Sequence, residues 1–316
     1  MSSLPKILRY SQDSEPGIRR IRRGKGFTYK SADDASVKCA ATLERIKRLG
    51  LPPAYEDVWI CADEFGHLQA TGLDVKGRKQ YRYHTAWRDF KDNKKFDKLP
   101  SFGVYLSYLR PKVRRDLKRG DNSKLFVCAA ITRLIDQGAL RVGREQYDAI
   151  GASTLRRRHI KLSDNKLKLD YKAKGGKRVR KQIKDRTLAH VLQTIDDLPG
   201  RRIFQYIGDN GELYPLDSTN VNDYIGGDFT AKTFRTWHGT LAAFEEAAKT
   251  DGEPTLKAMS EAAAARLHNT ASICRSSYIH PRVIQLSEDN ISKQLPDGNE
   301  RGLRKSERKL LALMRQ

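Results

Sequence analysis

The stretch from Arg266 to Pro281, RLHNTASICRSSYIHP, holds the residues best suited to chemistry. Tyr278, near its end, has a phenol oxygen that can act as a nucleophile once it loses its proton. Asn269 lies nine residues earlier, and its amide can donate a hydrogen bond but cannot titrate. The alanine-rich run Ala258–Leu267 favours a helix that leads into this stretch. A tyrosine after two serines is by itself most often an ordinary helix residue, so its interpretation depends on the rest of the chain.

Three other segments contain basic residues that suit phosphate chemistry. One is Arg141-Val-Gly, in a loop after a predicted helix, and another is a Lys-Gly-Gly turn at Lys174. The third is KTFRTWH, in which Arg235 stands three residues after Lys232. Each motif is weak alone, but together with Tyr278 they form an ordered set.

The charge of the chain points to a polyanionic partner. Lysine and arginine number 61 against 38 aspartates and glutamates, a formal net charge of +23 over 316 residues. The excess is spread along the whole length, which is typical of nucleic-acid-binding proteins. On charge alone, a ribosomal or generally adhesive basic protein remains the alternative.

The cysteines and the hydropathy pattern indicate a reduced, cytoplasmic compartment. The four cysteines are far apart and form no Cys-x-x-Cys pair, so neither a zinc knuckle nor a disulfide framework is expected. No apolar run is long enough to span a bilayer, and the first ten residues lack the apolar core of a signal peptide. We therefore expect no contact with membranes.

The N-terminal part reads as a small β-rich domain. The first thirty residues read as a basic, solvated arm, and a helix over Ala35–Leu49 follows it. Alternating apolar residues and turn signals then predict a meander of three strands. These strands are Val58–Cys61, His67–Leu73 and Arg78–His84.

Helical patterns dominate after a change of composition near Trp87, so we place a domain boundary after residue 90. The predicted helices are Phe102–Lys118, Lys124–Gln137, Asp185–Asp197, Asp217–Ile225, Thr230–Lys249 and Glu300–Gln316. Three strands are expected between the second and third of them: His159–Leu162, Leu167–Tyr171 and Lys177–Ile183. The predicted class is α+β, with a β-rich domain over residues 1–90 and a larger, mainly helical domain over residues 91–316.

The ordered set of motifs resembles the type IB DNA topoisomerases, above all the small two-domain branch of bacteria and poxviruses. The likeness runs from Leu51 to the tyrosine. It implies the fold of that family, in which an N-terminal domain and a catalytic domain clamp duplex DNA as a monomer. It also implies a catalytic set, with bacterial members similar to this chain in having asparagine where poxviral and eukaryotic relatives have histidine. That set is Arg141, Lys174, Arg235, Asn269 and Tyr278.

The resemblance also implies DNA contacts. Gln80, Tyr81 and Tyr83 match residues that touch duplex DNA in the poxviral enzymes, and the two tyrosines should share one face of their strand. Lys232 stands where the related tyrosine recombinases usually carry the histidine of H-x-x-R. The K-x-x-R pattern of this chain favours a topoisomerase.

The chemistry implied by the resemblance is internally consistent. Tyrosine attack on a phosphodiester creates a pentacoordinate state with extra negative charge, which two arginine forks can hold. Because tyrosine has a reference pKa near 10, neighbouring cations reduce the cost of its deprotonation. Lys174 is the expected acid for the leaving 5′ oxygen. The covalent 3′-phosphotyrosine conserves the energy of the broken bond, so swivelling and resealing would relax positive and negative supercoils without ATP.

No cofactor or metal is expected. The sequence contains no phosphate-binding P-loop, no paired aspartates of the D-x-D type and no zinc spacing. Two alternatives stay open at this point. One is a tyrosine recombinase, which would use the same transesterification on paired sites. The other is a non-catalytic DNA-binding protein that has kept the fold. The predicted location is the cytoplasm, at the nucleoid.

Overall fold

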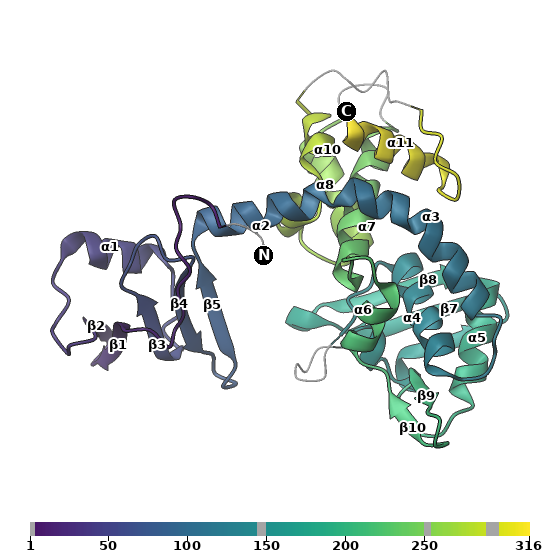
Figure 1. The fold of residues 1–316 in the computed structure, drawn as a ribbon, viewed down its shortest axis with the longest axis horizontal. Coiled ribbons are helices and arrows are strands. Elements are labelled where there is room, and N and C mark those ends of the chain that lie inside the picture. Colours follow the sequence, from purple (N-terminus) through teal and green to yellow (C-terminus); the bar gives the residue numbers. More distant parts are fainter. Residues whose placement is uncertain (1–3, 144–149, 250–253, 289–296) are drawn as a thin grey trace. The chain divides into compact units, whose positions relative to one another are not determined.

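A computed structural model of the chain describes residues 4–143, 150–249, 254–288 and 297–316 (Figure 1). The chain divides into two compact units, Met1–Lys95 and Phe96–Gln316. The division falls inside helix α2 (Thr85–Asp97), slightly later than the boundary that the composition suggests.

The N-terminal unit is built on a five-stranded antiparallel sheet of order β2-β1-β3-β4-β5. Alternating side chains of the sheet pack with Ile46 of helix α1 to form a small core. Its elements are β1 (Gly17–Arg23), β2 (Gly26–Lys30), α1 (Ala40–Arg48), β3 (Glu56–Cys61), β4 (Leu68–Leu73) and β5 (Lys79–Tyr83).

The structure corrects the expectation of a solvated N-terminal arm. The basic run that includes Arg19 and Arg22 forms strand β1, which pairs with β2 on one side and with β3 on the other. Pairing with β3 satisfies the hydrogen-bonding groups of this backbone. No local pattern in the sequence predicts that pairing. The three predicted meander strands are confirmed as β3, β4 and β5.

The C-terminal unit is mainly helical. Its central element is α7, which contacts α3, α4, α6, α8, α10 and α11. Its helices are α3 (Leu99–Asp116), α4 (Lys124–Gly138), α5 (Arg186–Asp196), α6 (Ser218–Ile225), α7 (Ala231–Ala247), α8 (Leu256–Leu267), α9 (Ala271–Ser277), α10 (Pro281–Gln285) and α11 (Lys305–Arg315). Helix α3 runs without a break through Pro111, where a local disturbance was expected.

The expected three-stranded sheet is present in this unit. Strands β6 (Ile160–Ser163), β7 (Lys166–Lys172) and β8 (Arg178–Lys184) are antiparallel, and their apolar face contacts α4 and α5 (Figure 1). A short hairpin, β9 (Gln205–Ile207) and β10 (Leu213–Pro215), was not predicted from the sequence. Short 3-10 turns lie at Ala152–Thr154, Arg157–His159 and Lys174–Gly176. The predicted α+β class with a β-rich first domain is confirmed.

Candidate active site

Helix α7 carries a functional face in the segment RTWHGT, residues 235–240. Arg235 is only 4% exposed. A Cβ added at Gly239 would lie 2.8 Å from the backbone oxygen of Tyr278, so only glycine allows the tyrosine to come this close. Thr240 Oγ1 donates to that same oxygen over 3.1 Å and accepts from the backbone N–H of His280. One helical turn therefore holds the backbone from the Tyr278 carbonyl to His280.

Tyr278 sits at the C-terminal end of α9. Thr270 caps the N-terminus of this helix by accepting from the N–H of Ile273, and the N–H of Tyr278 donates to the Cys274 oxygen over 2.8 Å. The tyrosine is partly buried against the core of its unit. The guanidinium carbon of Arg235 lies 5.3 Å from the centre of its ring.

Arg235 combines a fixed position with spare hydrogen-bonding capacity. Its Nη1 donates to the Ala139 oxygen over 2.6 Å and its Nη2 to the Leu267 oxygen over 3.1 Å. Its Nε is buried and, among the described residues, has no hydrogen-bond partner. Burial and then the nearby charge of Arg141 lower the pKa of this guanidinium, while Tyr278 opposes the shift. Arg235 is therefore close enough to Arg141 and Tyr278 for their charges to act on it.

The loop that carries Arg141 is held by a close backbone crossing. Ala152 N–H donates to the Arg141 oxygen over 2.7 Å. Gly143 has a φ of 90°, and a Cβ there would lie 2.9 Å from the Cα of Gly151. The glycine of the Arg-Val-Gly motif is thus required by the turn itself. Arg141 and Arg235 line one small cavity of about 10 Å³, together with the buried Tyr171.

His268 and Asn269 follow α8 directly. His268 ends the helix in the left-handed conformation, with a φ of 47°, and its ring lines the same cavity as the two arginines. Burial, followed by the charges of Lys181, Arg235 and Arg141, lowers its pKa to about 4, so the ring is neutral at pH 7. Asn269 is half-buried. It is not the cap of the next helix, because Thr270 has that role.

Lys174 follows Ala173, which lines the same cavity as Arg141 and Arg235. It is exposed in the turn between β7 and β8, where Gly175 and Gly176 both have positive φ. None of the described interactions joins it to Arg141, Arg235 or Tyr278. The charge of Lys177, in the same hairpin, opposes the rise that burial causes in the pKa of Cys274.

A buried ionic cluster joins α7 to three other helices. Arg110 donates to both oxygens of Asp136 and to both oxygens of Glu307, at distances of 2.7 to 3.1 Å. His238 Nε2 lies 3.0 Å from Asp136 Oδ1. These side chains belong to α3, α4, α7 and α11, so the C-terminal helix is bound to the scaffold that carries Arg235. His238 is accordingly a buried structural residue.

The residues expected to touch DNA lie on both units. In the N-terminal unit, the rings of Tyr81 and Tyr83 are stacked at 6.1 Å on an exposed face of β5, as predicted. Gln80 is half-buried, and its amide nitrogen donates to Asp74 over 3.0 Å. In the C-terminal unit, Lys232 is exposed one turn before Arg235.

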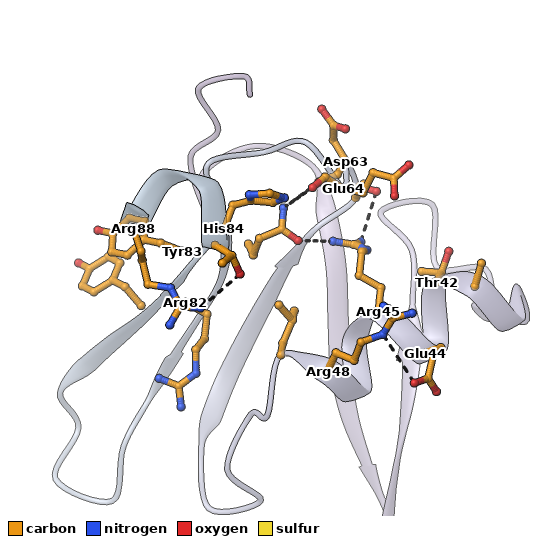
Figure 2. A pocket seen from close by; sticks show the side chains of 16 residues that line it. Thr42, Glu44, Arg45, Arg48, Asp63, Glu64, Arg82, Tyr83, His84 and Arg88 are labelled. Atoms are coloured by element: carbon orange, nitrogen blue, oxygen red, sulfur yellow. Dashed lines mark hydrogen bonds and ion pairs between the residues drawn. The ribbon is translucent and has the colours of Figure 1, made fainter. Parts of the chain in front are cut away.

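Both tyrosines line a hollow of about 960 Å³ in the N-terminal unit, whose other lining residues include four arginines and three carboxylates (Figure 2). Arg45 and Arg48 reach it from α1, and Arg82 reaches it from β5. Arg45 is fixed by bonds of 2.7 Å to the Gln69 side chain and the Cys61 oxygen. The hollow places further cations beside the aromatic face.

Comparisons with known proteins show which family the chain belongs to. The family model described as "Eukaryotic DNA topoisomerase I, catalytic core" matches residues 84–301, which is more than half of the chain. The chain belongs to this family. The model "Bacterial DNA topoisomerase IB, N-terminal domain" matches residues 26–74. The chain is also 29% identical over 296 residues to "DNA topoisomerase 1B" of Acanthamoeba polyphaga mimivirus, an alignment that covers 87% of this chain and 88% of that protein.

The family membership decides the class of activity. The protein is a DNA topoisomerase of type IB, an isomerase that acts on DNA, and the recombinase and the non-catalytic binding protein are not favoured. Within the described parts of the chain, no helix has the length and apolar character needed to cross a membrane.

Several residues that hold this site were not found from the sequence. Gly239 and Thr240 lie within a segment already singled out for Arg235, but their contact with Tyr278 spans almost forty residues. Lys181 also escaped notice. The feature of the sequence that could have revealed it is its position between Val179 and Ile183, on the apolar face of a predicted strand.

Proposed function

We propose that the protein cuts one strand of duplex DNA by attack of Tyr278 on a phosphodiester. The attack forms a 3′-phosphotyrosyl bond and releases a 5′-hydroxyl end. The free end swivels, positive or negative supercoils relax, and the 5′ hydroxyl reverses the reaction. The observation that supports this proposal is the position of Arg235, which lies 5.3 Å from the centre of the Tyr278 ring and lines one small cavity with Arg141.

The two arginines would hold the nonbridging oxygens of the phosphate. Arg235 is anchored to two backbone carbonyls and still has a buried Nε without a partner among the described residues. A buried donor without an acceptor is costly, and a phosphate oxygen would satisfy it. The same charges would stabilise the phenolate that forms during attack. This arrangement supports charge neutralisation by side chains of the protein, without ATP or a metal ion.

Lys174 and Asn269 would complete the set. Asn269 would donate a hydrogen bond to the phosphate. Lys174, on its exposed turn, would move towards bound DNA and protonate the leaving 5′ oxygen. A substrate whose bridging 5′ oxygen is replaced by sulfur tests this role, because a thiolate leaves without a proton. Lys174→Met should be slow on the normal duplex and near the unmodified enzyme on the sulfur duplex.

We also propose that one monomer holds the duplex with both units, with Gln80, Tyr81, Tyr83 and Lys232 in contact with it. The stacked tyrosines and the arginines of the adjoining hollow support a groove-facing surface on the N-terminal unit. A chromosomal substrate would place the enzyme in the cytoplasm, at the nucleoid of a bacterial host.

The decisive experiment is relaxation of supercoiled plasmid in EDTA without ATP, comparing the protein with Tyr278→Phe. We expect complete relaxation by the first and none by the second, although both bind DNA with similar affinity. Denaturation during the reaction should trap protein on the 3′ end of the cut strand. Relaxation by Tyr278→Phe, or a protein-linked 5′ end, would contradict the mechanism.

A further inference from the structure

Two helices end at the active site in the same way. The C-terminal cap of helix α4 is Ala139, with a φ of 51°, and that of α8 is His268, with a φ of 47°. Neither residue is a glycine, so the left-handed conformation must be held by surrounding contacts. Arg141 lies two residues after Ala139, and Asn269 directly follows His268. The relative placement of the two ends therefore sets the placement of the candidate residues.

Two cations bridge these helix ends. Lys181 Nζ donates to the Gly138 oxygen over 2.7 Å and to the Arg266 oxygen over 2.8 Å. Arg235 makes the adjacent bridge, from the Ala139 oxygen to the Leu267 oxygen. The last carbonyls of a helix lack partners within the helix and carry its negative dipole end, so both bridges satisfy and neutralise them.

Lys181 is an unusual residue for its position. It lies on β8 between Val179 and Ile183, on the face of the sheet that packs into the core. Burial, and then the charges of Arg266 and Arg235, lower its pKa to about 7. An apolar residue at this position would avoid the cost of burying an ammonium group among other cations. The charge and its two hydrogen bonds therefore serve a purpose other than core packing.

Strand β8 connects the lysine hairpin to these two helix ends. It returns from the turn that carries Lys174, and it pairs along its whole length with β7. Through Lys181 this strand is joined directly to the ends of α4 and α8. A single side chain thus contacts the backbone beside the Arg141 loop and beside the Asn269 segment, and it stands on the strand of the lysine hairpin.

We propose that Lys181 is a positioning residue of the active site, which fixes the Arg141 loop, the Asn269 segment and the lysine hairpin relative to one another. The inference rests on the proposed function. Two of the three N–H groups of Lys181 are committed to backbone carbonyls, so it acts through the segments that it joins.

The test compares three full-length variants in single-turnover cleavage of a short duplex and in DNA binding. Lys181→Met removes both hydrogen bonds, Lys181→Arg keeps a forked donor, and Lys184→Met removes the same charge from an exposed site on the same strand. We expect Lys181→Met to cleave about 100-fold more slowly, because small displacements of reacting groups cost this much. Its affinity for DNA should stay within about threefold of that of the unmodified enzyme, since Lys181 contacts backbone carbonyls of the protein.

The controls separate positioning from other roles. Lys181→Arg should recover most of the rate, and Lys184→Met should match the unmodified enzyme. On the sulfur-substituted duplex, Lys181→Met should still cleave slowly, whereas Lys174→Met should cleave at nearly the rate of the unmodified enzyme. Restoration of Lys181→Met by sulfur would make Lys181 the acid and overturn the proposal, as would an unchanged rate on the normal duplex.

Two further points keep the test decisive. If Lys181→Met loses its cooperative thermal transition, Lys181→Gln replaces it, since its shorter side chain keeps one amide donor. Cleavage by Lys181→Gln at the rate of the unmodified enzyme would then count against the proposal. Failure of the unmodified protein to cleave at all would instead overturn the proposed function.

Discussion

The guanidinium carbon of Arg235 lies 5.3 Å from the centre of the Tyr278 ring, although Arg235 belongs to α7 and Tyr278 directly follows α9. The arginine is anchored by Ala139 and Leu267, and the tyrosine by Gly239 and Thr240. Their relationship is thus fixed through backbone contacts on both sides.

Thr240→Val should impair catalysis more than DNA binding. It leaves the Tyr278 oxygen and the His280 N–H without their shared partner, at a cost of about 1 to 3 kcal/mol in the free energy of unfolding. We expect cleavage to slow about tenfold through displacement of the tyrosine. The matched control is Thr236→Val on the same helix, because the Thr236 hydroxyl is buried without a described partner. Equal effects of the two substitutions on cleavage would contradict this account.

Asn269 and His268 can be distinguished by substitution. If Asn269 donates to the phosphate, Asn269→Ala should reduce the cleavage rate about 10- to 100-fold. His268→Asn should stay within about threefold of the unmodified enzyme, because asparagine tolerates the left-handed conformation and the histidine ring is neutral. Single-turnover rates at saturating enzyme provide the measurement. The reverse order of effects would assign the donor role to His268.

The buried cluster should make the catalytic unit sensitive to acid. Arg110 holds the pKa of Asp136 and of Glu307 below their ordinary values against the opposing effect of burial. Their contribution to stability is therefore present above the pKa values of the unfolded chain, near 4, and is lost as pH falls towards the lower folded values.

Glu307→Gln should lower the free energy of unfolding at pH 7 by about 3 kcal/mol, since it breaks a buried ion pair. It should also flatten the fall in stability between pH 6 and pH 3, measured by denaturant unfolding followed through the tryptophans. Glu44→Gln, which breaks an exposed pair with Arg48, should cost about 1 kcal/mol or less. A steeper acid dependence in Glu307→Gln would rule out this origin.

The stacked tyrosines of β5 should contribute to DNA affinity without contributing charge. Replacing Tyr81 and Tyr83 together by alanine should weaken duplex binding about tenfold, because base or sugar contacts of aromatic rings are worth about 1 to 3 kcal/mol. The slope of log affinity against log salt should be unchanged and steep, since phosphate contacts set it. Tyr214→Ala, at another exposed stacked tyrosine, is the control. A shallower slope would show that the tyrosines act through displaced basic residues.

Much of the architecture was predictable because its patterns are local. The periodicity of the helical segments and the turn at Lys174 predicted α4, α5, α7 and the three-stranded sheet. The strand at β1 was missed because a run of arginines has no apolar alternation, and its pairing with β2 and β3 makes it a strand.

The sequence by itself determined the residue types: a tyrosine, two arginines, a lysine turn and an asparagine in a fixed order. Tertiary structure alone decided that Arg235 lies beside Tyr278 and that it lines one cavity with Arg141. It also decided that Lys181 joins Gly138 to Arg266, residues more than a hundred positions apart. Such contacts depend on how α4, α7, α8 and β8 pack, and packing is a property of the whole core that no local pattern encodes.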